Sequence, residues 1–263
     1  MTAASESGSA SGRVMDAPGT VDKAIDVLLA LSAAPAALGV TALGRALNLP
    51  KSSTHRLLAT LTRRGLVERD EGGRYRPGMA LVAMGLGVLE RDPLWAAARP
   101  VLEEEASSLG ETVFLVAARA GRLVVLDKVE GTGFLRAAPR VGSSVPVHAT
   151  AVGKLFMAFA PDRVLPDPEP ESFTRRTLTS KRALAAAVSE ARGRGFAENR
   201  DEWIEGLSVL AAPITCRGEL HGALAVAAST PRLRELGPEV VVRAREAAAR
   251  VGARLEGRME VIS

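Results

Sequence analysis

The stretch VTALGRALNLPKSSTHRLLATLTRRGL, residues 40–66, has the pattern of two short helices joined by a tight turn. We expect the first helix at about 40–47. The second should begin at Lys51, because the preceding Pro50 has no N–H and the first turn of a helix leaves its N–H groups unpaired in any case. Asn48 lies between the helices and tolerates the left-handed backbone conformation that such a corner requires. The stretch therefore predicts a helix-turn-helix.

The second of these helices has one apolar side and one polar side. The apolar side, expected to be buried, consists of Leu57, Leu58 and Leu61 at helical spacing. Small hydroxyl and basic residues at its start suit a surface that lies on a phosphate backbone, since the first N–H groups of a helix attract phosphate. We expect the DNA contacts to come from Lys51, Ser52, Ser53, Thr54, His55, Arg56 and Arg63. Helical bundles also contain such helix pairs, so spacing alone leaves that alternative open.

The segment VERDEGGRYRPG, residues 67–78, reads as a β-hairpin with short strands near 66–69 and 74–76. A helix-turn-helix followed at once by a hairpin is a winged helix. The wing would bring its arginines to the phosphates beside the groove. These arginines are Arg69, Arg74 and Arg76.

The distribution of charge agrees with this prediction. The net charge of the 263 residues is only +4, but residues 20–78 hold nine Lys and Arg against five Asp and Glu. Residues 79–263 hold 24 against 23. Sequence-independent affinity for DNA comes from such a local excess of cations. Chance unevenness of a solvated surface is the alternative.

Several classes of protein are disfavoured by what the sequence lacks. With one cysteine, Cys216, and three scattered histidines, it predicts no intramolecular disulfide and no metal site. It has no GxSxG or phosphate-loop motif, so we expect no catalytic residues and no cofactor. No apolar run approaches the roughly 18–20 residues that span a bilayer. Residues 1–19 lack the apolar core of a signal peptide, so we expect a disordered tail and a cytoplasmic protein without a membrane partner.

Residues 20–92 should form the winged helix-turn-helix, 20–78, and a linker helix, 79–92. The first helix is expected from Thr20 to about Ser32, with Val21, Ile25, Leu28 and Leu29 on one face and Leu31 beside it. The segment MALVAMGLGVLE, residues 79–90, is apolar on nearly every face. It either packs against the first helix or packs on a second subunit. We favour a homodimer, because such domains usually read two half-sites.

Residues 93–263 predict a second domain of the α+β class. We expect strands at 112–119, 122–129, 134–138, 207–215 and 220–228, helices at 93–109, 150–159, 181–194 and 238–257, and a loop at 198–206. Strands linked as hairpins predict a mainly antiparallel sheet, with helices to one side. Glu103, Glu104 and Glu105 point about 100° apart on a helix, so they predict a solvated face rather than a site.

The chain as a whole resembles transcriptional regulators of the IclR type over about residues 20–257. The matching segments are LPKSSTHRLL (49–58), RGLV (64–67), VHATAVGK (147–154), Gly195–Phe196, Glu205–Gly206 and AAPI (211–214). The resemblance implies a winged helix, a linker helix and a GAF-like effector domain. It also implies double-stranded operator DNA and a small-molecule effector as partners, and assembly as a homodimer or homotetramer. We expect a regulator that acts as a repressor.

The start of the helix at 150–159 offers a site for an anion. Thr150 can cap this helix, which leaves the N–H groups of Ala151, Val152 and Gly153 available to a carboxylate. The resemblance places small organic acids at Ala151 and Val152, with an acidic and a cysteine position opposite. Those two positions correspond to Asn199 and Val209 in this chain.

Asn199 and Val209 change the expected effector. An asparagine carries no charge, and a valine makes the wall apolar. We therefore expect an effector larger or less polar than glyoxylate. The open alternatives are a degenerate pocket that binds nothing, a sensor that acts without DNA, and an enzyme.

Overall fold

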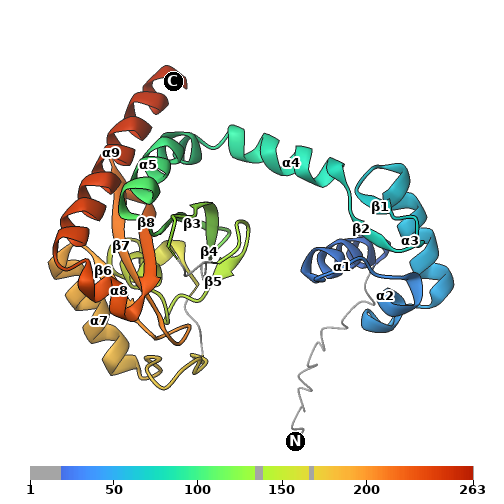
Figure 1. Ribbon diagram of the computed structural model, residues 1–263, viewed down its shortest axis with the longest axis horizontal. Helices are drawn as coiled ribbons and strands as arrows, with labels where there is room; N and C mark the ends of the chain where they lie inside the picture. Colours follow the sequence, from blue (N-terminus) through green and yellow to red (C-terminus); the bar gives the residue numbers. More distant parts are fainter. Residues whose placement is uncertain (1–18, 134–138, 166–168, 263) are drawn as a thin grey trace, which may run out of the picture. The chain divides into compact units, whose positions relative to one another are not determined.

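The computed structural model describes residues 19–133, 139–165 and 169–262. It separates into two compact units, Met1–Gly87 and Val88–Ser263, most of whose elements are labelled in Figure 1. The helix α4 (Met79–Glu90) runs across the boundary between them. Within the described ranges, no helix is both long and apolar enough to cross a membrane.

The first unit has the order of elements that a winged helix-turn-helix requires. These are α1 (Thr20–Ala33), α2 (Val40–Ala46), α3 (Lys51–Arg63), β1 (Val67–Arg69) and β2 (Tyr75–Pro77). The two strands pair antiparallel, and Tyr75 also bridges Leu38 ahead of α2. Asn48, between α2 and α3, has a φ of 52°. The left-handed corner predicted at this residue is therefore confirmed.

The core of this unit joins all three helices to the hairpin. It consists of Val27, Leu31, Leu43, Leu58, Leu61, Val67 and Tyr75. Leu58 and Leu61 are buried as predicted for α3, and Leu57 is half-buried beside them. The apolar stripe of α3 thus fixes the helix with its opposite side turned to solvent.

Most of the apolar face expected on α1 is exposed, although Leu28 is half-buried against the core. The expected face consisted of Val21, Ile25, Leu28 and Leu29. Val21 is 71% exposed and Leu29 is 62% exposed, whereas Val27 and Leu31 are buried. α1 has apolar residues on two sides, and the core of the unit covers only one of them. The second apolar side remains open, and every residue of α4 is partly or fully exposed as well.

The second unit is built on one antiparallel sheet in the order β5-β4-β3-β8-β7-β6. Its strands are β3 (Thr112–Arg119), β4 (Arg122–Val129), β5 (Ser144–Val145), β6 (Ala197–Arg200), β7 (Leu207–Cys216) and β8 (Glu219–Ser229). Its helices are α5 (Pro93–Leu109), α6 (Ala151–Phe159), η1 (Pro161–Arg163), α7 (Lys181–Arg194), α8 (Thr230–Glu235) and α9 (Glu239–Ile262). All neighbouring strands pair antiparallel, as predicted.

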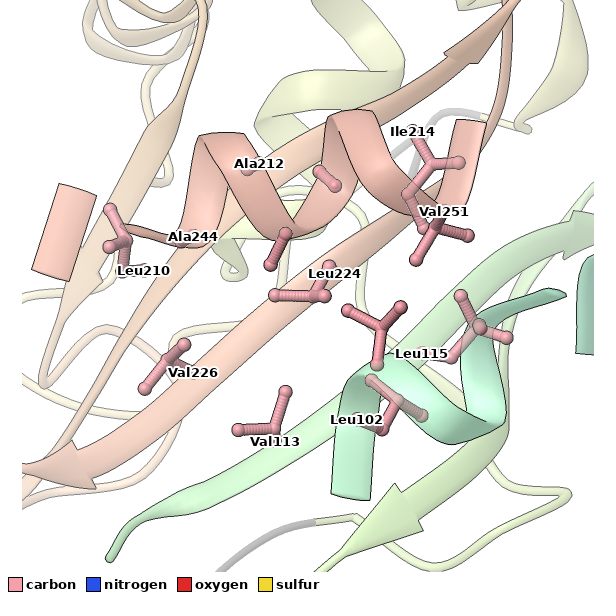
Figure 2. Packing of buried hydrophobic residues seen from close by; sticks show 14 of the residues in the cluster. Leu102, Val113, Leu115, Leu210, Ala212, Ile214, Leu224, Val226, Ala244 and Val251 are labelled. Atoms are coloured by element: carbon pink, nitrogen blue, oxygen red, sulfur yellow. The ribbon is translucent and has the colours of Figure 1, made fainter. Parts of the chain in front are cut away.

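Helices cover both faces of the sheet, which corrects the expectation of helices to one side. Successive residues of a strand point to opposite faces, so Val113 and Leu115 of β3 pack with α5 and α9 while Phe114 and Val116 pack with α6. Figure 2 shows the first of these layers, in which Leu102 of α5 and Val251 of α9 cluster with side chains of the strands. The second layer, around α6, holds the features described below.

Two further expectations for this unit are wrong. The segment expected as a loop at 198–206 is a loop only from residue 201, because residues 198–200 belong to the strand β6, which pairs with β7 along the edge of the sheet. Glu105 is only 2% exposed rather than solvated, and its carboxylate accepts hydrogen bonds from Arg243 (2.5 Å) and Arg250 (2.7 Å) of α9. The strand expected at 134–138 lies outside the described residues.

Candidate nucleic-acid interface and effector pocket

The solvent side of α3 carries a dense group of cations and hydroxyls. Residues 51–64 contain four Lys and Arg and no acidic residue. The exposed residues among those predicted to touch DNA are Lys51, Ser52, His55, Arg56 and Arg63, and Ser53 is half-buried. The first turn of α3 also leaves N–H groups without partners inside the helix. This face can therefore bind a phosphate backbone along its length.

Thr54 is the exception on α3, and its assignment as a DNA contact is corrected. Its side chain is fully buried, and its hydroxyl donates a hydrogen bond of 3.1 Å to the carbonyl of Pro50. It lies against Gly44 of α2, where a Cβ would come within 3.0 Å of the Thr54 hydroxyl oxygen. Thr54 therefore packs α3 on α2 and does not reach the surface.

The arginines of the wing are exposed, but two of them have acidic partners in the same hairpin. Arg74 pairs with Asp70 at 3.2 Å, and Arg76 pairs with Glu68 at 3.1 Å. The guanidinium of Arg69 lies 5.8 Å from the centre of the Tyr75 ring. Residues 67–77 contain three arginines and three acidic residues. The hairpin thus adds no net positive charge, and the local excess of this region lies on α3.

The start of α6 is capped by Thr150, as predicted. The Thr150 hydroxyl accepts a hydrogen bond of 3.1 Å from the N–H of Gly153 and donates one of 2.7 Å to the carbonyl of Pro146. Because the Gly153 N–H is used by the cap, it is not available to a ligand, which corrects the prediction for this residue. The N–H groups of Ala151 and Val152 remain as donors at the start of the helix.

Gly153 has a packing role instead. A Cβ at this position would overlap the carbonyl oxygen of Val147. Only glycine allows α6 to approach the preceding segment this closely. The glycine thus brings the start of α6 against the segment that leads into it.

A small cavity of about 20 Å³ lies beside the capped end of α6. Four of the predicted effector residues line it: Thr150, Val152, Asn199 and Val209. The rest of the wall is formed by Phe114, Pro139, Val145, Trp203, Leu207 and Ala227. Ala151 and Gly153 are buried next to it without lining it. Residues about 50 positions apart in the sequence thus meet at one largely apolar pocket.

Sequence reasoning missed a buried ion pair one turn along α6. The Lys154 ammonium lies 2.5 Å from a carboxylate oxygen of Glu202 and donates to the carbonyl of Glu198 at 2.9 Å. The two side chains are only 5% and 11% exposed. Burial raises the pKa of Glu202, and the ammonium of Lys154 acts in the opposite direction. A lysine on a helix with an otherwise apolar surface was the available signal.

Comparisons with known proteins agree with this arrangement. The sequence model of the "IclR helix-turn-helix domain" matches residues 20–71, and that of "Bacterial transcriptional regulator IclR C-terminal" matches residues 86–253. The chain is 33% identical over 217 residues to the probable transcriptional regulator SauR of Cupriavidus necator. The aligned part covers 81% of this chain and 86% of that protein.

Solved structures share the fold. The crystal structure of Thermotoga maritima IclR has a TM-score of 0.76 and 26% identity, and the match covers 90% of this chain and 98% of that one. An IclR homologue from Microbacterium hydrocarbonoxydans, complexed with 4-hydroxybenzoate, has a TM-score of 0.75 at 23% identity over 91% of this chain and 100% of that one. The second likeness shows the fold alone. Since a family model covers more than half of the sequence and the relatives are regulators rather than enzymes, the chain belongs to the IclR family of DNA-binding transcriptional regulators.

Proposed function

We propose that the exposed face of α3 reads operator DNA, with Arg56 at a base edge and Lys51 at a phosphate. The observation that carries this proposal is the run of exposed cations on α3 without an acidic neighbour on that helix. Arg56 lies about one turn inside the helix, where a side chain can enter the major groove, and Lys51 is at its first position. Arginine commonly pairs with guanine through two hydrogen bonds. Ser52, Ser53, His55 and Arg63 belong to the same surface, with Arg69, Arg74 and Arg76 of the wing beside the groove.

Two alanine variants test these roles by gel shift on the promoter region of the protein's own gene. Arg56→Ala should lose the discrimination between operator and random DNA, by about 1–3 kcal/mol. Lys51→Ala should weaken binding to operator DNA and to random DNA about equally. It should also flatten the plot of log affinity against log salt concentration. Arg182→Ala, which removes an exposed cation from α7, is the matched control. If Arg56→Ala behaved as expected for Lys51→Ala, the base contact would be wrongly assigned.

The pocket beside α6 supports a proposal for the effector, namely a small organic acid with an apolar body. The N–H groups of Ala151 and Val152, with the dipole of α6, favour a carboxylate at this end of the helix. Asn199 adds no charge, and Val209 and Phe114 give the ligand apolar walls. The homologue complexed with 4-hydroxybenzoate shows that a protein of this fold holds an acid with an apolar ring. Glyoxylate has no apolar group to pack against those walls.

Calorimetric titration of the full chain with carboxylic acids of increasing apolar size tests the effector. Affinity should rise with the apolar body, and glyoxylate or pyruvate should bind weakly. Tight binding of glyoxylate would refute the proposal. Binding of none of the acids, in a protein that still binds its operator, would favour the degenerate pocket.

Assembly as a homodimer, or as a homotetramer, is proposed from the open apolar sides of α1 and α4. Val21 on α1 is 71% exposed, and Met79 and Met84 on α4 are 68% and 64% exposed. Such surfaces mark protein interaction sites, and a second copy would supply the second DNA-reading domain. Met84→Glu should shift the sedimentation of the chain toward the monomer. An unchanged sedimentation coefficient would count against this surface.

Regulation as a repressor is the simplest proposal for this domain set. Blocking a promoter requires only occupancy of the operator, which a DNA-binding domain provides in the cytoplasm beside the chromosome. The effector can change that occupancy only by its different affinity for the DNA-bound and free states. Transcription in vitro should therefore fall when the protein is added and recover with the effector. A rise on addition would identify an activator.

A further inference from the structure

Asn199 is the polar residue of the pocket whose hydrogen bonding is incomplete. It lies on β6, is 3% exposed and lines the cavity. Its side-chain amino group donates a hydrogen bond of 3.0 Å to the carbonyl of Ala149. Its Oδ1 is buried and has no hydrogen-bond partner within the described part of the chain. A buried acceptor without a donor is costly, so this atom points to a missing partner.

The orientation of the amide follows from the carbonyl of Ala149. If the amide were turned over, Oδ1 would face that carbonyl oxygen, and two acceptors would meet at hydrogen-bonding distance. The amino group must therefore face Ala149, which leaves the oxygen for the pocket. Thr150, the neighbouring polar side chain, already uses its hydroxyl in the cap of α6. Asn199 thus presents an acceptor, not a donor, to a molecule that enters.

The rest of the site supplies donors and apolar contacts. The N–H groups of Ala151 and Val152 begin α6, two and three residues after the carbonyl that holds Asn199. Val209 is the direct strand partner of Asn199 and gives an apolar wall on the same face. A complementary ligand therefore has a carboxylate, a hydrogen-bond donor next to it, and an apolar remainder.

We propose that this pocket selects 2-hydroxy acids with an apolar side chain over the 2-oxo acids of the same carbon skeleton. The inference rests on the proposed effector function and names its ligand class. The carboxylate accepts from the first N–H groups of α6, and the hydroxyl on C2 donates to Oδ1 of Asn199. A 2-oxo acid places a second acceptor against the same Oδ1, and an acid without an oxygen on C2 leaves that atom unpaired.

The test is calorimetric titration of the full chain with two series of three acids. The aliphatic series is 2-hydroxy-3-methylbutanoate, 2-oxo-3-methylbutanoate and 3-methylbutanoate, and the aromatic series is mandelate, phenylglyoxylate and phenylacetate. In the series that binds, the 2-hydroxy acid should bind on the order of tenfold to a hundredfold more tightly than the other two. Equal or tighter binding of the 2-oxo acid overturns the inference but leaves the proposed acid effector in place. Binding of no acid in either series overturns both.

Two variants separate the role of Oδ1 from the shape of the pocket. Asn199→Leu removes the acceptor in a similar volume, so the preference for the 2-hydroxy acid should disappear. Val209→Ala changes the apolar wall beside Asn199, so it should alter the affinity for all the acids while the ratio between the 2-hydroxy and 2-oxo affinities stays the same. A preference that survives Asn199→Leu in a folded protein, judged by its thermal unfolding, contradicts the assignment. The titrations of the unaltered chain decide the ligand class even if Asn199→Leu does not fold.

Discussion

Replacing Lys154 by Met removes one partner of the buried ion pair between α6 and the loop that follows β6. Methionine keeps most of the length and volume of the lysine stem, so the variant tests the charge rather than the packing. The carboxylate of Glu202 would lose the ammonium that lies 2.5 Å away, and its other oxygen is already buried without a partner within the described residues. The variant thus leaves a buried carboxylate with little to compensate it.

The expected loss of stability is large. Removing one member of a buried pair costs about 3–5 kcal/mol. The unit Val88–Ser263 falls in the size range in which 1 kcal/mol corresponds to about 2–4 °C in Tm. The Tm of this unit should therefore fall by about 6–20 °C. Glu190→Gln is the matched control, because its partner Arg194 is 45% exposed and Glu190 itself 61%. An exposed pair of this kind contributes about 0–1 kcal/mol.

The loss of stability in Lys154→Met should also depend on pH, and the titration of Glu202 determines in which direction. Burial raises the pKa of Glu202 above its ordinary value of 4.5, while Lys154 and, less strongly, His148 lower it. Without Lys154 the folded-state pKa rises further, so ionisation of this carboxyl opposes folding. The loss is complete above that raised pKa. It diminishes as the pH falls from that raised pKa toward the pKa of Glu202 in the unaltered chain, which itself lies above 4.5.

Thermal unfolding of the full chain at about pH 5 and about pH 8 measures both effects. The double variant Lys154→Met, Glu202→Leu is the decisive companion, because it removes both charges. It should be more stable than Lys154→Met alone, since the cost of the single variant comes from the carboxylate left behind. The reasoning is refuted if the Tm deficit of Lys154→Met is the same at both pH values and the double variant loses the sum of the two single losses.

Two smaller predictions concern the packing of α3 and the cap of α6. Gly44→Ala would place a Cβ 3.0 Å from both the Leu49 carbonyl oxygen and the Thr54 hydroxyl oxygen, so it should destabilise the DNA-binding unit by about 1–3 kcal/mol. Urea denaturation measures this, and an unchanged midpoint would refute the contact. Thr150→Ala removes the cap from the Gly153 N–H and should lower stability by about 0.5–2 kcal/mol. Thr150→Ser should restore most of it in the same thermal assay, and failure to do so would show that the methyl group matters more than the hydroxyl.

The local signals of the helix-turn-helix were sufficient to predict it. The leucine spacing of α3 and the corner residue Asn48 are local features, and the structure confirms both. The buried side of α1 could not be predicted in the same way. α1 has two apolar sides, and only the tertiary arrangement decides that Val27 lies inside while Leu29 lies outside.

In the second unit, the misread elements are those in which a polar residue is buried. Asn199 occupies an inward position of β6, so the alternation that marks a strand was broken and the segment read as a loop. Glu105 is inward on α5 because α9 brings Arg243 and Arg250 to it from about 140 residues away. No local pattern specifies which of three adjacent glutamates meets those arginines.

The pocket was predicted from the start of one helix. The wrong assignment of Gly153 as a donor to the ligand follows from the same local reasoning. Thr150 was expected to cap α6, and a capping side chain must take an N–H for itself. That N–H belongs to Gly153, so the cap that makes the site also removes one of its three expected donors. The remaining donors, on Ala151 and Val152, still suit a single carboxylate.

The same loop carries the wall of the pocket and the partner of the buried lysine. Trp203 lines the cavity, and Glu202, the residue before it, is held by Lys154 of α6. The cavity has room for about one water molecule, so an acid with an apolar side chain can bind only if the wall moves outward. Because Glu202 and Trp203 are consecutive, an outward movement of Trp203 would act on the ion pair. If the proposed effector binds at the start of α6, it must therefore displace part of a loop that the Lys154–Glu202 ion pair ties to the same helix.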